Sequence, residues 1–479
     1  MSSSKSNYTS LGVIAVAIIG ALGIGYATGN QGLVLDILLT IGLLMLGITV
    51  LVTIHELGHF LTAKAFGMRV EIFSIGFPPK IFSIKKGETD YQFGATPLGG
   101  YVKISGMIDE SLDTDHISKE PEPYEFRAKP VWQRLIVMVG GVVMNILLGI
   151  FIFSMIKFSY GEQKLPLSQT AYGIEVFPNT IGEKLGFQTG DKLVSYRGEQ
   201  YSYFDDFADM SHLQDDDAFY RVERNGETKK IEVPSYAINF LTNDSIYNLL
   251  FEPDMPAQLL VSKDGPALSS GLQTGDLVTH LDSQQISLFS DLRRYLSEKE
   301  PISEVLVTFE RDGVTKQTSV ILDSLSRMVV SKDMKNFFIL EKKSFSFFES
   351  FGPGTAAAFG FLSANVQGFK KMADPNVESS KMLLGPLQIA KVFFTRFKNA
   401  GWPGFLELTG MLSMILAFMN ILPIPALDGG HVVFLLYEGI TRREPSTKVR
   451  LIAQQVGMVI VLGIMVLVLF NDAIQVFFN

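Results

Sequence analysis

The sequence predicts an α-helical polytopic membrane protein that carries two copies of a small mixed α/β module and a β-hairpin region next to the membrane. Of its 479 residues, 47% are hydrophobic and only 19% are charged, whereas soluble globular proteins have about 25% charged residues. The apolar residues are concentrated in a few long runs, and the charged residues lie mostly between them. An internal repeat in the polar part of the chain supplies the third observation.

Four apolar runs are expected to cross a membrane. A transmembrane helix needs roughly 20 mostly apolar residues to span about 30 Å of hydrocarbon, and the runs that qualify are residues 33–54, 135–156, 408–422 with its flanks, and 452–470. A fifth run, residues 11–28, is rich in Gly and Ala and borderline in length. It is interpreted as an extra N-terminal span, with a signal peptide or a docked helix as alternatives.

Charges in the short loops predict the orientation of these spans. Arg442, Arg443, Lys448 and Arg450 cluster between the last two spans, and short basic loops generally face the cytoplasm. This places the end of the first predicted span in the cytoplasm as well. Residues from about 157 to 350 are therefore expected outside, on the periplasmic or extracytoplasmic side.

The polar region contains a repeat with a period of 85 residues. Gly186-Phe-Gln-Thr-Gly-Asp191 matches Gly271-Leu-Gln-Thr-Gly-Asp276, and a strand-like run follows each copy, at residues 192–196 and 277–281. A period of this length is the size of a small domain. The pattern resembles the bacterial PDZ signature, which Gly265-Pro-Ala267 strengthens in the second copy only. The alternative is two spacer domains that bind no peptide.

Residues 70–104 are expected to form hairpins on the cytoplasmic side. Apolar and polar residues alternate there, around Gly76, Pro78, Pro79, Gly87 and the pair Gly99-Gly100, a pattern typical of strands and turns. Such hairpins could offer an edge strand to an unwound substrate, which would give recognition that tolerates many sequences. The alternative is an inert cytoplasmic loop.

The strongest chemical signal is His55-Glu56-Leu57-Gly58-His59, at the end of the first predicted span. On a helix the two histidines lie one turn apart on one face, so both imidazoles can reach one zinc ion, and Glu56 can act as a general base beside them. A hydrolytic zinc site needs a third protein ligand. The best candidate is Asp428, because it follows a span broken by Pro423 and Pro425, and a carboxylate there is functional by default.

Two classes of function are disfavoured by composition. The formal net charge of −8 and the pI near 5.4 argue against nucleic acid as a partner, since phosphate binding needs a basic surface. The absence of Cys excludes disulfides, thiolate metal sites and a Cys nucleophile.

The pair His55-Glu56-x-x-His59 and Asn420-x-x-Pro423-x-Pro425-x-Leu427-Asp428-Gly429 resembles the site-2 protease family of intramembrane zinc metalloproteases. The tandem PDZ-like insert narrows the likeness to the bacterial RseP-type members, over nearly all of residues 33–470. The resemblance implies Zn²⁺ held by the residues at His55, His59 and Asp428, with Glu56 as general base. It also implies an inner-membrane enzyme that cleaves single-span membrane proteins. These are commonly anti-sigma factors already trimmed by a site-1 protease in an envelope stress response, and remnant signal peptides are a second class.

Other polar residues near the predicted spans receive lesser roles. Asn420 and Asn145 are candidates for positioning substrate, although Asn420 could instead cap the broken helix. Gly141-x-x-x-Asn145 could also serve helix packing alone, with the glycine allowing close approach and the amide bonding across helices. His431 could contact the metal ligands without binding the metal itself. The other three histidines, at positions 116, 212 and 280, are expected to face solvent.

Together these features predict an order of segments and one alternative function. The segments are 1–32 (possible extra span), 33–66 (zinc-motif span), 67–130 (hairpin region), 131–157 (span), 158–245 and 246–325 (PDZ-like domains), 326–403 (linker and amphipathic segments), 404–430 (span with the third ligand), 431–451 (cytoplasmic loop) and 452–479 (last span and tail). The alternative is a catalytically inactive scaffold that binds exported peptides. An ion transporter is less consistent, because the chain has no repeated pairs of spans.

Overall fold

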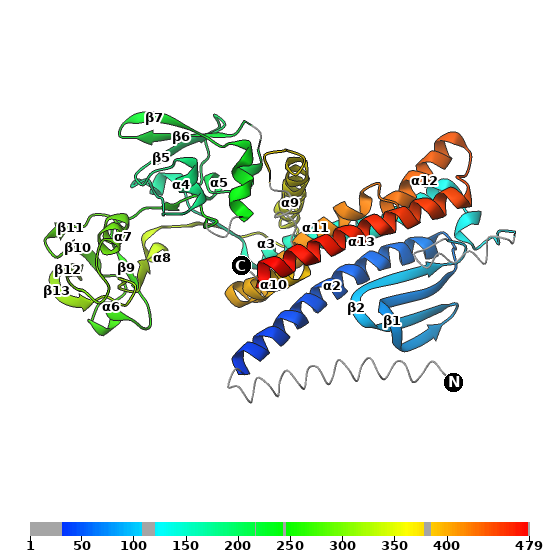
Figure 1. The fold of residues 1–479 in the computed structure, drawn as a ribbon, viewed down its shortest axis with the longest axis horizontal. Helices are drawn as coiled ribbons and strands as arrows, with labels where there is room; N and C mark the ends of the chain where they lie inside the picture. The colour runs from blue at the N-terminus through cyan, green and yellow to red at the C-terminus, as the bar shows by residue number, and fades with distance from the viewer. Residues whose placement is uncertain (1–30, 108–119, 216, 243–245, 378–384, 478–479) are drawn as a thin grey trace. The chain divides into compact units, whose positions relative to one another are not determined.

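The fold was analysed in a computed structural model that describes residues 31–107, 120–215, 217–242, 246–377 and 385–477 (Figure 1). The chain divides into two compact units. Unit 1 contains the first 160 residues, residues 345–366 and residues 380–479, while unit 2 contains residues 161–344 and 367–379. The possible N-terminal span at residues 11–28 and His116 lie outside the described residues.

Unit 1 is built from helices and one folded hairpin. Its elements are α2 (Gln31–Ala65), β1 (Val70–Lys86), β2 (Thr89–Ile104), η1 (Phe126–Ala128), α3 (Val131–Tyr160), most of α9 (Phe351–Lys371), α10 (Pro386–Ala400), α11 (Trp402–Ile421), α12 (Asp428–Thr441) and α13 (Thr447–Phe477). Four of these helices are long and apolar enough to span a membrane, over Val34–Ala65, Val131–Tyr160, Trp402–Ile421 and Thr447–Asp472. They include the four runs predicted from the sequence.

Glycines bring α2 and α3 into direct backbone contact. A Cβ atom added at Gly58 would lie 2.2 Å from the carbonyl oxygen of Gly140, and one added at Gly140 would lie 2.8 Å from that of Gly58. Only glycine allows two helices to approach so closely. Gly58 belongs to the histidine motif, so the crossing packs this part of α2 directly against α3.

The hairpin region forms the expected strands, which fold into one small sheet. The first half of β1 pairs on one side with residues 90–93 and on the other with residues 100–104 of β2, and the second half of β1 folds back onto residues 89–94. Residues 100–104 pair with β1 alone, from Gly100 opposite Ile75 to Ile104 opposite Val70. This segment is therefore an edge of the sheet.

The amphipathic helix α10 is hydrogen-bonded to the last span, α13. The Asp472 side chain of α13 is fully buried and accepts hydrogen bonds from the backbone N–H groups of Leu387 (2.7 Å) and Gln388 (3.3 Å). These N–H groups belong to the first turn of α10, which has no intrahelical acceptors for them. Asp472 thus caps α10, and Gly385 leaves the space that the carboxylate occupies.

Unit 2 contains the repeat as two similar folding patterns. The first comprises β3 (Glu162–Lys164), η2 (Leu167–Gln169), β4 (Ile174–Glu175), α4 (Ile181–Leu185), β5 (Lys192–Tyr196), α5 (Phe204–Phe207), η3 (Met210–Gln214), β6 (Phe219–Arg224), β7 (Glu227–Glu232), η4 (Ser235–Thr242) and β8 (Glu252–Pro253). The second comprises β9 (Leu259–Val261), α6 (Pro266–Ser269), β10 (Leu277–Leu281), β11 (Gln284–Gln285), α7 (Phe289–Ser297), β12 (Glu304–Arg311), β13 (Val314–Ile321) and β14 (Val330–Lys332), followed by α8 (Met334–Phe337) and β15 (Glu341–Lys343).

The two patterns have equivalent central sheets, hydrophobic cores and turns. The strand orders are β5-β6-β7 and β11-β10-β12-β13, and β5 and β10 coincide with the strands predicted after the repeated turn. Each pattern surrounds its own hydrophobic core. Within the turns, Gly190 and Gly275 have φ values of 93° and 97°, which glycine adopts without strain.

One histidine does not lie where the sequence suggested. His280 is exposed as expected, but His212 is 7% exposed and stacks on Tyr196 with ring centroids 3.7 Å apart. The prediction that His212 faces solvent was wrong. The short η3 turn directs the imidazole into the aromatic core of the first pattern.

Candidate metal centre and active site

The two histidines of the motif project from one face of α2. His55 and His59 are 7% and 8% exposed, and their rings meet edge to face with centroids 4.9 Å apart. The space beside them exists because position 141 on α3 is glycine. A Cβ atom there would lie 2.5 Å from Nε2 of His59 and 2.6 Å from Cε1 of His55.

Asp428 reaches the histidines from the first residue of α12. The chain between α11 and α12 turns at Pro423 and Pro425, and α12 starts at Asp428, six residues after the turn begins at Leu422. The turn is too tight for side chains at the next two positions, because a Cβ atom at Gly429 would lie 2.1 Å from the Leu422 carbonyl and one at Gly430 would lie 2.6 Å from the Ile424 carbonyl. This packing fixes the direction of Asp428.

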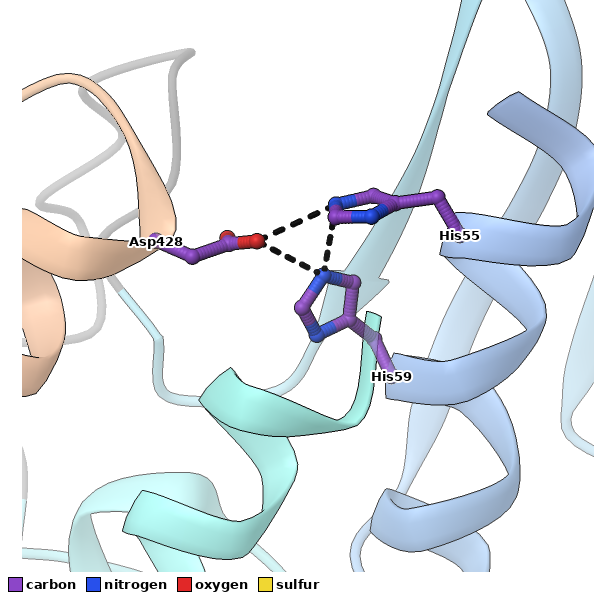
Figure 2. A group of neighbouring side chains, drawn as sticks. All are labelled: His55, His59 and Asp428. Carbon is purple, nitrogen blue, oxygen red and sulfur yellow. Dashed lines mark hydrogen bonds and ion pairs between the residues drawn. The ribbon is translucent and has the colours of Figure 1, made fainter. Parts of the chain in front are cut away.

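The three side chains converge on one point (Figure 2). Nε2 of His55 lies 3.2 Å from Nε2 of His59 and 3.1 Å from Oδ2 of Asp428, and Nε2 of His59 lies 3.4 Å from the same oxygen. Ligands held tetrahedrally at about 2.0–2.1 Å from a zinc ion are separated by about 3.3 Å. The separations in the group therefore match what one zinc ion requires.

The surroundings of the group also suit a cation. Oδ2 of Asp428 is buried and has no hydrogen-bond donor among the described residues other than the imidazoles. Nδ1 of His59 lies 2.8 Å from the Val137 carbonyl oxygen, so this nitrogen carries the proton and Nε2 keeps a lone pair for a metal. Among the described residues, no other group of three or more His, Asp or Glu side chains meets the same spacing.

Glu56 lines a cavity of about 240 Å³ together with the three converging residues. The same cavity is bordered by Gly99, Gly100, Tyr101 and Val102 of the β2 edge, by Asn420 of α11, and by Leu416, Met138 and Phe77. The Glu56 carboxylate, the three converging side chains and the edge strand thus share one space. That arrangement can bring a general base, a Lewis acid and an extended peptide together.

The two asparagines both contact His55. Asn145 on α3 is fully buried, with its amide 3.2 Å from Nδ1 of His55, and Asn420 has its amide nitrogen 3.1 Å from Nε2. Ser413 of α11 donates a hydrogen bond to the backbone carbonyl oxygen of Asn145 (2.8 Å), and this bond joins α11 to α3 beside the histidines. Sequence reasoning missed the contributions of Ser413 and Val137. No motif marks either residue, since Val137 acts through its backbone.

Comparisons with known proteins agree with this geometry. Residues 43–464 match the model of peptidase family M50. The chain is 28% identical over 462 residues to the Vibrio cholerae protein named "Putative zinc metalloprotease", covering 91% of this chain and 99% of that protein. It is 26% identical over 467 residues to "Regulator of sigma-E protease RseP" of Salmonella typhimurium, covering 91% and 99%, and 26% identical over 468 residues to "Regulator of sigma E protease" of Haemophilus influenzae, covering 92% and 100%.

The match to the family model extends over most of the chain and includes both separate parts of the converging group, His55 with His59 and Asp428. Zinc is named as the metal of the Vibrio relative, and the group meets the requirements of zinc in ligand type and separation. The chain is a zinc metalloprotease of peptidase family M50, the site-2 protease family.

Proposed function

We propose that this protease hydrolyses a peptide bond within the transmembrane segment of single-span membrane proteins. The observation that carries the proposal is the convergence of His55, His59 and Asp428 beside Glu56 on helices apolar enough to lie in a membrane. Two relatives are named as regulators of sigma E, which supports anti-sigma factors as one substrate type. Remnant signal peptides are a second.

The residues of the site divide the chemistry among them. His55, His59 and Asp428 would hold the zinc ion, which when bound would supply a Lewis acid for the hydrolysis of the peptide bond. The Glu56 carboxylate accepts the proton of the attacking water and then delivers it to the leaving amine nitrogen. Asn420, whose amide nitrogen lies at the same cavity, donates a hydrogen bond to the substrate carbonyl.

Asn145 acts on His55 rather than on the substrate. As a ligand through Nε2, His55 must carry its proton on Nδ1, and that proton needs an acceptor. Oδ1 of Asn145 is buried and has no hydrogen-bond partner within the part of the chain that the structure describes. A 180° rotation of the amide places this oxygen on the Nδ1–H of His55, so that Asn145 fixes its tautomer as the Val137 carbonyl fixes that of His59.

The β2 edge supplies the substrate-binding surface. A transmembrane helix has its amides already hydrogen-bonded, so it must unwind before cleavage. Residues 100–104 pair with β1, and Gly100, Tyr101, Val102 and Ile104 line the zinc cavity, so an extended segment in that cavity would lie beside this edge. Main-chain pairing there tolerates many side chains.

The two PDZ-like domains of unit 2 act outside the membrane as a gate against substrates with bulky exported domains. The second copy supports peptide binding better than the first. A groove of about 470 Å³ lies between its nine-residue helix α7 and the segment that leads into β14. In the first copy the corresponding helix, α5, has four residues.

Two experiments test the proposal. Glu56→Gln protein should accumulate uncleaved single-span fragments in bacterial membranes, and proteomics of these fragments identifies the substrates; a pattern equal to that of the active enzyme would contradict proteolysis of such segments. Because the chain has no native Cys, single Cys residues at Asp205 or Asp282 can be labelled from outside. Labelling that requires access to the cytoplasm would reverse the proposed orientation in the inner membrane.

A further inference from the structure

A buried ion pair joins α3 to α12. Arg134, in the first turn of α3, is 5% exposed and pairs through Nη2 with Oε1 of Glu438, in the last turn of α12. The side chain of Glu438 is itself only 15% exposed. Nη1 of Arg134 also lies 3.5 Å from Glu444, in the loop that leads to α13. One arginine of α3 therefore contacts both α12 and the segment that follows it.

The two helices that this pair joins carry different parts of the zinc site. On α3, Val137 follows Arg134 by one turn, and its carbonyl oxygen lies 2.8 Å from Nδ1 of His59. On α12, the first residue is Asp428, which points at the histidines (Figure 2). The Arg134–Glu438 pair consequently connects the helix that orients one histidine to the helix that supplies the carboxylate.

The other end of α12 is fixed by the turn before it. This turn packs against α13, because a Cβ atom at Gly457 would lie 2.4 Å from the Pro425 carbonyl oxygen. Glu438 lies ten residues after Asp428, which is about 15 Å along a helix. A helix that is fixed only at its first residues can still tilt about that point. The ion pair supplies a second fixed point, and the two points together define the direction of α12.

Stability alone does not account for a charged pair at this position. Leu435 of α12 and Val137 of α3 already belong to one hydrophobic core cluster, and an apolar pair of similar volume is often at least as stable as a buried ion pair. What an ion pair adds is direction, because a guanidinium donates along fixed N–H bonds. Zinc sites need such precision: ligand distances hold within about 0.2 Å, whereas a shift of a helix by one residue moves it about 1.5 Å.

We propose that Arg134 and Glu438 are positioning residues of the zinc centre. Their ion pair sets the axial position and the tilt of α12, and it thereby holds Asp428 at the distance from His55 and His59 that one zinc ion requires. Neither residue belongs to the converging group or lines the zinc cavity. The inference rests on the zinc ligands of the proposed function and is independent of which membrane proteins are cleaved.

Cobalt substitution tests this assignment, because the visible absorption of Co²⁺ reports the number and geometry of its ligands. Glu438→Leu keeps a side chain of similar size that accepts no hydrogen bond. In the full-length protein in detergent we expect a changed Co²⁺ spectrum. By chelator competition we expect a zinc affinity at least about 10-fold lower, the low end for residues that orient metal ligands. The matched control is Glu407→Leu, which breaks an exposed pair with Arg396 (3.6 Å) between α11 and α10 and should change neither.

A double variant separates positioning from stability. Arg134→Met combined with Glu438→Leu replaces the ion pair by an apolar pair and leaves no buried unpaired charge, since Glu444 is 48% exposed and keeps Arg450 at 3.8 Å. Helices α3 and α12 should therefore retain their protection in hydrogen exchange. The cobalt spectrum should still be altered and the zinc affinity still reduced, because the directional bonds are gone.

Two results in the double variant would overturn the proposal. A spectrum and an affinity equal to those of the unmodified protein would mean that the pair serves stability alone. Loss of protection in α3 and α12 would make the pair a requirement of folding rather than of positioning.

Asp428→Ala is the reference that separates this inference from the zinc assignment. It should alter the cobalt spectrum more than Glu438→Leu does. An altered spectrum in Asp428→Ala protein together with an unchanged one in Glu438→Leu protein would overturn the positioning role and leave the zinc ligands standing. An unchanged spectrum in Asp428→Ala protein would remove Asp428 from the ligands, and the positioning role would fall with it.

Discussion

Buried carboxylates occur in both units of the molecule, but their partners differ. In unit 2, Asp191 and Asp276 are each 1% exposed, and each receives two hydrogen bonds of 2.6 and 2.7 Å from an arginine, Arg224 or Arg311. The same arginines also donate to the carbonyls of Gly186 and Gly271, both at 2.9 Å. In unit 1, Asp428 instead faces two imidazole nitrogens.

The difference distinguishes carboxylates that stabilise the fold from a carboxylate that takes part in the chemistry. A bidentate guanidinium satisfies both the charge and the geometry of a carboxylate, so the repeated Gly-x-x-x-Gly-Asp turn is complete within the protein. Each imidazole uses its Nδ1 in a contact on the other side of the ring, so its Nε2 directs a lone pair to the point that Asp428 also faces. A lone pair is a hydrogen-bond acceptor, whereas a carboxylate needs a donor or a cation. The group at Asp428 becomes favourable only when a cation binds.

Removing Asp428 should have the largest effect. Asp428→Ala is expected to lose zinc and all measurable cleavage, while unit 2 keeps its fold because its own carboxylates are paired internally. Metal analysis of the purified protein and a substrate-cleavage assay measure both. A variant with full zinc and full activity would refute the assignment of Asp428 as third ligand, without affecting that of the histidines.

Glu56→Gln should separate metal binding from catalysis. Glutamine keeps the shape and hydrogen-bonding capacity of Glu56 but cannot accept the proton, so zinc should remain while cleavage falls at least about 10²-fold. The same two assays apply, with Glu71→Gln on β1, a partly exposed carboxylate away from the zinc cavity, as the control. Normal cleavage by Glu56→Gln protein would eliminate the general-base mechanism.

Asn145→Leu tests whether the amide orients His55. Loss of a residue that orients a metal ligand typically lowers metal affinity 10–100-fold, and we expect a loss in this range by competition with a zinc chelator. Asn145→Gln should not restore affinity, because the longer side chain does not fit a fully buried position beside α11. Ser413→Ala, which removes only the bond to the Asn145 backbone, is the control and should lose less. Unchanged affinity in the leucine variant would leave Asn145 a packing role only.

Disrupting a buried Arg–Asp pair in unit 2 should have the opposite result, a loss of stability without a loss of zinc. Arg224→Met leaves Asp191 buried without its cation and should destabilise the first repeat domain of unit 2 by about 3 kcal/mol, with zinc content and catalysis retained. Hydrogen exchange of the full-length protein, followed by mass spectrometry, measures this over β5 and β6. Adding Asp191→Asn should recover part of the loss because no buried charge remains. Loss of zinc in Arg224→Met protein would show that the two units are coupled.

The sequence predicted the chemistry of this molecule better than its supporting contacts. The spacing of His55 and His59 requires only helical geometry, and Asp428 was found because a carboxylate at a broken apolar span is costly unless it has a role. The repeated turn likewise predicted β5 and β10. By contrast, the role of Gly141 in leaving space for the histidines depends on how α3 crosses α2. The Val137 carbonyl and the Arg–Asp pairs depend on tertiary packing that no local pattern encodes.

The smallest expected effect concerns a histidine in each of the two repeat domains of unit 2. His212 is buried, with Nδ1 2.8 Å from the Tyr220 hydroxyl, and burial lowers its pKa below the usual value of about 6.5, although Asp209 and Asp215 act in the opposite direction. Below pH 6.5 the unfolded chain therefore binds a proton that the folded domain excludes. The first domain should lose stability as the pH falls through this range, by at most about 1.4 kcal/mol per pH unit. In the second domain, His280 is exposed. Hydrogen exchange at pH 7.5 and 5.5, corrected for intrinsic rates, should show opening only in the first domain, and His212→Phe should abolish this dependence. Equal losses in both domains, or a dependence that persists in His212→Phe protein, would assign the effect to the aspartates instead.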